Sequence, residues 1–126
     1  MKTLIAGLAG ALVLTTGAAQ AQEISAADQQ DMQCFALVAA QAGVGEQSPE
    51  MMAGLATAMM FYLGRMEGRS PDTDWLARIE TYLRSSEIEK LSTHSERCAA
   101  ELISKGKALT DWGARLQTLT NAQKGG

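Results

Sequence analysis

The spacing of apolar residues is the feature that most constrains the fold. They recur every three or four residues from about residue 25 to residue 120, the period of an amphipathic helix. No stretch alternates with period 2 for long enough, or carries enough Val, Ile and Thr, to make a strand. Pro49 and Pro71 each follow a serine, an arrangement typical of a helix start. The sequence therefore predicts an all-α fold, a small domain of four helices.

Capping residues place the first three helices. Ser25 and Asp28 form the S-x-x-D pattern of a helix start, and Gly43 is a typical residue at a helix end. The first helix is therefore expected from Ser25 to Gly43. The second is expected over residues 49–66 and the third over residues 72–84. Each has an apolar face that we expect to pack inward: Met32, Phe35, Ala36, Ala39 and Ala42 in the first; Met52, Leu55, Met59, Tyr62 and Leu63 in the second; Trp75, Leu76, Ile79, Tyr82 and Leu83 in the third.

The fourth helix is expected to begin at the capping box of residues 86–89 and to reach about residue 120. Its apolar face keeps one phase past two glycines: Ile88, Leu91, Cys98, Leu102, Leu109, Leu116 and Leu119. Because Gly106 and Gly113 each cost about 1 kcal/mol relative to Ala in a helix, a bend or break over residues 105–107 is the alternative. Residues 121–126 are predicted to be a frayed tail.

Residues 1–21 have the pattern of a cleaved export signal. Lys2 precedes an apolar run over residues 4–14, and Ala19-Gln20-Ala21 fits the small-x-small cleavage pattern. The run is about half of the ~20 residues that a spanning helix needs. We therefore expect a single domain over residues 22–126, periplasmic or secreted, with no membrane span after cleavage.

The two cysteines are expected to form one disulfide. Cys34 and Cys98 lie mid-face in the first and fourth predicted helices, and the exported compartment is oxidising. The bond would clamp the two helices and close a loop of about 65 residues, which is worth on the order of 4 kcal/mol. The alternative is a soft-metal site formed by His94, Cys98 and Cys34. A lone His without a second Cys pair makes that alternative the weaker one, and we predict no metal.

The stretch between Met51 and Arg69 is the candidate binding surface. It holds five methionines, Met51, Met52, Met59, Met60 and Met66. Methionines fill irregular cores, line adaptable surfaces or bind Cu(I), and the core is the favoured interpretation. Arg65 and Arg69 stand four apart and could fork onto a carboxylate or phosphate. We take Met59, Tyr62, Arg65 and Arg69 as the candidate surface; the alternative is that both arginines only stabilise the end of the helix.

Composition and charge exclude several function classes. The chain without Lys2 carries 10 basic and 14 acidic residues, so nucleic acid is not an expected partner. The single His and the scattered carboxylates form no recognisable nucleophile and base pair. We therefore expect no enzyme activity, no catalytic residue and no cofactor.

Two families resemble this architecture. The Cys34-Phe35-Ala36-Leu37 run, linked to a late cysteine within residues 32–105 of an exported helical chain, resembles the periplasmic acid-stress chaperones of the HdeA and HdeB type. The Phe61-Tyr62-Leu63-Gly64 run before a late cysteine is similar to helical, disulfide-containing periplasmic immunity proteins. The first resemblance implies a stress-related holdase and the second a specific inhibitor or immunity partner of a secreted toxin or enzyme. Neither assigns a functional residue. A small copper or ligand carrier that uses the methionines is the third expectation.

Overall fold

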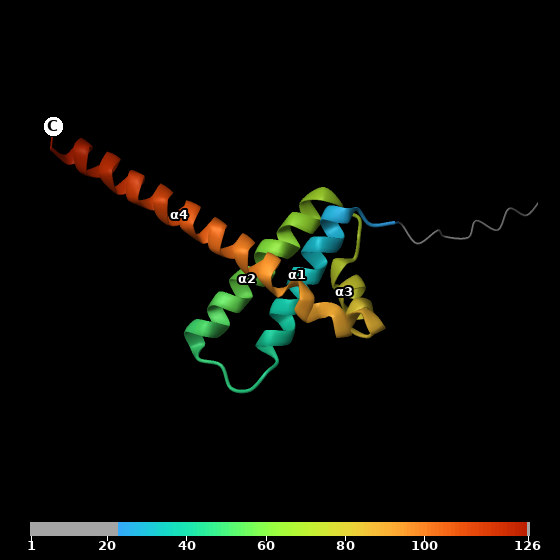
Figure 1. Cartoon of the computed structure of the whole chain (residues 1–126). Coiled ribbons are helices and arrows are strands. Elements are labelled where there is room, and N and C mark those ends of the chain that lie inside the picture. The colour runs from blue at the N-terminus through green and yellow to red at the C-terminus, as the bar shows by residue number, and fades with distance from the viewer. Residues whose placement is uncertain (1–22, 126) are drawn as a thin grey trace, which may run out of the picture.

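The computed structural model describes residues 23–125, and all of its regular structure is helical (Figure 1). Four α-helices and one 3-10 helix follow one another: α1 (Ala26–Ala42), α2 (Pro49–Arg69), α3 (Trp75–Leu83), η1 (Ser86–His94) and α4 (Ser95–Lys124). The all-α, four-helix prediction is confirmed. The predicted export signal lies outside the described residues. No helix in the described range is both long and apolar enough to cross a membrane.

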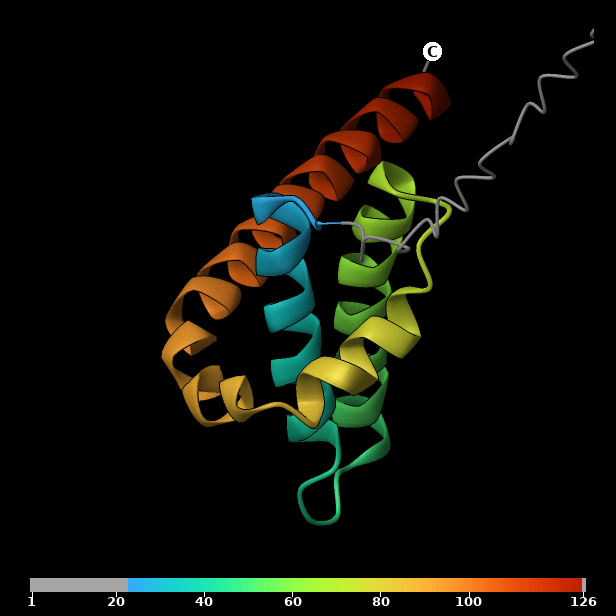
Figure 2. The same cartoon turned by 90° about the vertical axis from the view of Figure 1, so that its right-hand side faces the viewer.

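Helices α1 and α2 form an antiparallel pair that lies side by side in both views (Figures 1 and 2). Their starts are capped as the sequence predicts. The Ser25 hydroxyl accepts a hydrogen bond from the Asp28 amide at 3.0 Å, and the Ser48 hydroxyl accepts one from the Met51 amide at 3.2 Å. Gly45 turns the chain between the helices with a φ of 64°, a value that favours glycine.

The core lies between this pair, α3 and the beginning of α4. Its fully or nearly buried apolar residues come from all four helices: Met32, Cys34, Phe35, Val38, Ala58, Tyr62, Met66, Trp75, Ile79 and Cys98. Figure 2 shows α3 lying across the α1–α2 pair, where it closes the core with Trp75 and Ile79. These two residues are four apart and so face the same side of a helix.

The third helix begins later than predicted. Ser70 and Pro71 do not start it, because Ser70 caps the end of α2 and its carbonyl accepts a hydrogen bond from the Trp75 indole at 3.1 Å. Asp74 is the cap of α3, and its carboxylate accepts from the Ala77 amide at 3.0 Å. The expectation that Leu76 is buried is wrong: this side chain is 59% exposed. One residue along a helix is a turn of about 100°, which carries Leu76 off the face that holds Trp75.

The predicted fourth helix is in two parts. Its first nine residues form η1, a 3-10 helix in which Leu91 is buried, and the α-helical hydrogen bonding of α4 begins only at Ser95. From there α4 continues through Gly106 and Gly113 to Lys124, so the alternative of a break near residues 105–107 is wrong. The end of α4 also lies four residues beyond the expected position, within the segment that was expected to be frayed.

Most of α4 extends away from the other helices. Cys98 is buried and Leu102 packs against the core, but every residue from 103 to 124 is exposed. Figure 1 shows this part projecting as an isolated rod, which we call the arm (residues 103–124). Leu109, Leu116 and Leu119, which belong to the apolar face expected for the fourth helix, therefore do not pack inward. They keep the phase of Cys98 but are 40–67% exposed, and only the edge of a shallow groove brings Leu109 near α2.

Candidate functional site

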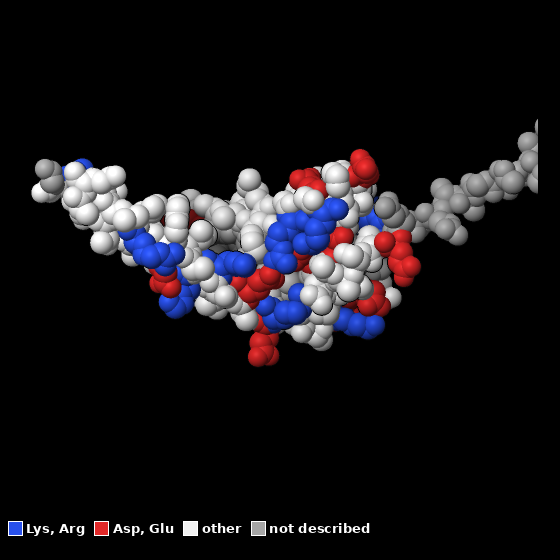
Figure 3. Space-filling model, turned by 90° about the horizontal axis from the view of Figure 1, so that it is seen from above, with Lys and Arg blue, Asp and Glu red and all other residues white. Residues whose placement is uncertain are grey.

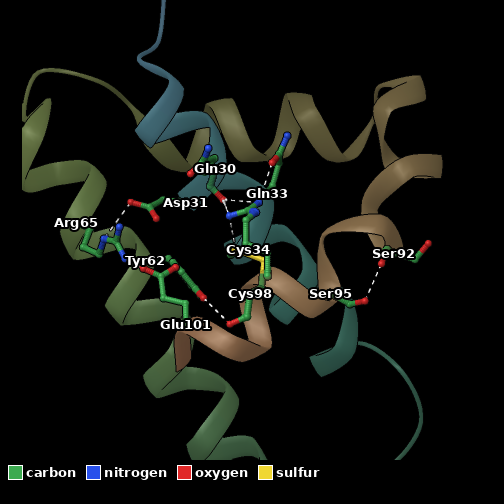
Figure 4. Close-up of a disulfide and its surroundings, with 11 residues drawn as sticks. Gln30, Asp31, Gln33, Cys34, Tyr62, Arg65, Ser92, Ser95, Cys98 and Glu101 are labelled. Atoms are coloured by element: carbon green, nitrogen blue, oxygen red, sulfur yellow. Dashed lines mark hydrogen bonds and ion pairs between the residues drawn. A yellow bond between two sulfur atoms is a disulfide. The ribbon is translucent and has the colours of Figure 1, made fainter. Parts of the chain in front are cut away.

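A disulfide attaches α4 to the body of the protein (Figure 4). Cys34 of α1 and Cys98 of α4 are bonded with their Cα atoms 5.4 Å apart, and both residues are buried. The predicted bond is confirmed, and its presence is compatible with an oxidising compartment. Since both sulfurs are used in the bond, they are not thiolate ligands for the alternative metal site with His94.

Polar contacts surround the disulfide and fix the first turns of α4. The Tyr62 hydroxyl donates to the Cys98 carbonyl at 3.2 Å. Burial, together with the negative charges of Glu101 and Asp31, raises the pKa of Tyr62 to about 12, so this donor keeps its proton. Arg97 lies over the bond, with Nη1 3.3 Å from the Cys34 sulfur and Nη2 3.0 Å from the Gln33 side-chain oxygen.

Two arginines of α2 connect α1 and α4 through carboxylates. Arg69 pairs with Asp31 and, at 2.8 Å from Nε to Oδ1, with Asp28. Arg65 pairs with Asp31 at 3.2 Å and with Glu101 of α4. Asp28 and Asp31 are 2% and 1% exposed. Buried carboxylates require such partners, because an unpaired charge in a protein interior is costly.

The environment of Asp28 favours its ionised form. Burial alone would raise the pKa of this carboxyl, but hydrogen bonds from Ser25, Arg69 and Ser70 together with the charge of Arg69 outweigh burial and hold the pKa below its usual value. The hydrogen bond to Asp31 likewise raises the pKa of Arg69. The pair of Asp28 and Arg69 therefore stays charged at neutral pH.

The predicted surface of Met59, Tyr62, Arg65 and Arg69 is mostly part of the fold. Tyr62 is fully buried, which corrects its assignment to a surface, and Met59 is partly buried against the core. The two arginine side chains are 34% and 35% exposed and bind carboxylates of the same chain. The alternative, in which the arginines serve the structure, describes these contacts better.

The methionines do not gather into one site. Met51, Met52 and Met60 are exposed, whereas Met66 is fully buried in the core. Residues 23–125 also contain no group of three or more His, Cys, Asp and Glu side chains close enough to hold a metal ion. The methionines of α2 are therefore divided between the surface and the core, and copper binding stays an alternative prediction.

The arm carries an exposed apolar row on the apolar face that the sequence predicts for the fourth helix. Leu109, Trp112, Leu116 and Leu119 follow one another at spacings of three, four and three residues and are 40–67% exposed. This spacing places them on one narrow stripe of the helix. Trp112 had not been singled out; its place in this spacing is the signal that could have identified it. We call these four residues the seam.

A shallow apolar groove lies where the arm leaves the body. It has a volume of about 250 Å³ and separates the first half of α2 from α4. Small residues and one ring form its α2 side, and the start of the arm forms the other: Gly54, Thr57, Ala58 and Phe61; Leu102, Lys105, Gly106 and Leu109. The groove continues the apolar surface of the seam because Leu109 belongs to both.

Charge divides between the arm and the body. Lys105, Lys107, Arg115 and Lys124 lie on the arm with Asp111 as its single acidic residue, whereas the other 13 of the 14 acidic residues precede it. Figure 3 shows basic side chains spaced along the arm. The acidic balance of the whole chain therefore conceals a basic, apolar arm on an acidic body.

Comparisons with known proteins do not assign the chain to a family. The chain matches no protein-family model, no curated protein and no solved structure. The two resemblances stay predictions.

Proposed function

We propose that this protein acts by binding other proteins, without turnover, in the periplasm or outside the cell, and that the arm is its binding element. The observation that carries the proposal is the seam: four large apolar side chains in a row that no element of the described chain covers. Exposed apolar patches bordered by polar residues mark interaction sites in monomeric proteins.

The chemistry of the seam favours an apolar segment of another protein. Trp is enriched among the residues that dominate binding energy, and Leu109, Leu116 and Leu119 extend the contact along the helix. A stripe of this kind packs against apolar anchors that recur at helical spacing on a partner. Basic residues beside it attract acidic chains.

Of the protein-binding functions, a holdase fits best. The seam is exposed while the body is folded, so capture of an unfolding protein requires no prior rearrangement of the core. A specific inhibitor or immunity partner would use a preformed polar surface, and the arginines suited to that role are bound to Asp28, Asp31 and Glu101.

The test is the aggregation of a thermally unfolding enzyme such as citrate synthase, followed by light scattering with the oxidised mature protein. We expect the wild-type protein to suppress scattering and the double variant Leu109→Ser with Leu119→Ser to suppress it several-fold less. Ile103→Ser is the matched control, because Ile103 is 71% exposed on the arm but lies off the seam. Equal suppression by the double variant and the control would remove the seam from the binding site.

A further inference from the structure

We infer that a second copy of this chain covers the seam when no other protein does, so that the protein forms a symmetric dimer through its arms. The inference rests on the proposed role of the arm as a binding element and names an occupant for it. Four features of the molecule support it: the spacing of the seam, the composition of the arm, the groove and the distribution of charge.

The seam has the spacing of a helix that packs against another helix. Spacings of three, four and three residues are those of the a and d positions of a coiled coil. The same stripe, followed toward the body, contains Cys98 and Leu102, which do pack against helices of the same chain. The partner of the seam is therefore expected to be helical as well.

The arm lacks the packing that stabilises helices in proteins. Its 22 residues include two glycines and three threonines whose hydroxyls hydrogen-bond carbonyls four residues earlier, which is a poor composition for an isolated helix. Most helical stability in proteins comes from burying one face rather than from intrinsic propensity. A covering helix supplies this burial along the whole seam.

The groove at the base of the arm offers a position for that helix. Gly54 and Gly106 line it, and an added Cβ at either would meet nothing within 4 Å, so a second backbone can approach closely. Phe61 provides an apolar wall beside Leu109. If each arm enters the groove of the other copy, the two contacts are identical and the assembly closes as a two-fold dimer.

Charge decides between two ways of pairing. Two arms lying only against each other would bring together two segments that each carry four basic residues and one acidic residue. An arm lying against the other body meets residues 23–102, which carry 13 acidic and six basic residues, so the net charges of the two segments are opposite. The arm also suits a helix better than an anionic membrane, because its seam is a narrow stripe rather than the broad apolar face of an interfacial helix.

The experiment measures the oligomeric state of the oxidised mature protein by sedimentation velocity across a dilution series. We expect a dimer that dissociates on dilution. Leu116→Glu should raise the dissociation constant at least about tenfold, because it places a charge in the buried seam. Ile103→Glu adds the same charge at an exposed apolar position off the seam and should leave the constant unchanged.

A second measurement follows Trp112 directly. Trp75 is 2% exposed, so the quenchable fluorescence comes from Trp112, and it should become protected from acrylamide as the concentration of wild-type protein rises. Circular dichroism and intact mass confirm that both Glu variants keep the helices and the disulfide.

Three outcomes would overturn the dimer. These are a monomer at every concentration, a Leu116→Glu variant that dimerises like the wild type, or a monomer that binds vesicles containing phosphatidylglycerol through the seam. A monomeric protein that still suppresses aggregation refutes the dimer and leaves the proposed function standing. A seam-dependent dimer that suppresses no aggregation refutes the holdase alone.

Discussion

The two parts of α4 share one helix and one apolar phase but have opposite environments. Before residue 103 the helix is fixed by the disulfide at Cys98, the hydrogen bond from Tyr62 and the ion pair of Glu101 with Arg65. From residue 103 to residue 125, every residue is exposed. The difference shows that an apolar period specifies which face of a helix seeks a partner, while the arrangement of the other elements decides whether the same chain supplies one.

The two tryptophans give the largest expected contrast between body and arm. Trp75→Ala should lower the free energy of unfolding by roughly 3–5 kcal/mol, because it leaves a cavity in the core and removes the hydrogen bond to the Ser70 carbonyl. Trp112→Ala should change it by less than about 0.5 kcal/mol. Denaturant titration followed by circular dichroism, at a concentration where the chain is monomeric, checks both. Similar losses would mean that the arm packs against the body.

Acid should weaken the body through Asp28. The pKa of this carboxyl is lowered in the folded state, so its contribution to stability is complete above pH 3.8, the unfolded value, and is lost as the pH falls through the folded value. Asp28→Asn should cost roughly 1.5 kcal/mol at pH 7, the low end for hydrogen bonds to a charged group, because the Arg69 side chain is 35% exposed.

The check is the midpoint of denaturation, measured from pH 6 down to the acid limit for the wild type and for Asp28→Asn. The variant should show a flatter fall below about pH 4. Asp111→Asn is the control, because its ion pair with Lys107 lies on the arm, where both side chains are exposed. An unchanged pH profile in Asp28→Asn would place the acid-sensitive group elsewhere.

A smaller contrast between the two parts is expected from Gly113→Ala. An added Cβ there meets nothing within 4 Å, so the change should stabilise the helix of the arm by about 1 kcal/mol without touching the body. Hydrogen exchange should show stronger protection of arm amides in the monomer and unchanged protection of α1. A drop in the stability of the body would contradict the separation of the two parts.

Local signals made much of the body predictable. The Ser25 and Ser48 caps, the extent of α1 and the Cys34–Cys98 pairing all follow from residues near in sequence or from the compartment. The start of α3 could not be predicted in this way. The Ser70-Pro71 pair resembles a helix start in the sequence, but in the structure the Trp75 indole donates a hydrogen bond to the Ser70 carbonyl. The exposure of Leu76 and the 3-10 geometry of η1 likewise depend on tertiary packing.

The candidate site was less accessible to sequence reasoning. Arg65 and Arg69 had a visible spacing, but their partners, three residues apart on α1, became apparent only when α1 and α2 were side by side. The sequence places Leu109, Leu116 and Leu119 on one apolar face, but their exposure could not be predicted because periodicity carries no information about the distance to another helix. The difference in charge between arm and body is visible in the sequence and is a signal that could have distinguished the two parts.

The position of the disulfide gives the arm leverage. Cys98 lies near the base of α4, and the 26 residues from there to Lys124 span about 39 Å of helix, so a tilt of only about 10° at this pivot moves the tip by about 7 Å. A small change of helix tilt at the base, where Tyr62 and Glu101 contact their partners, therefore becomes a large displacement of the exposed end of the arm. The cross-link thus fixes the base of this 30-residue helix, while a small change of tilt moves its exposed end by several ångströms.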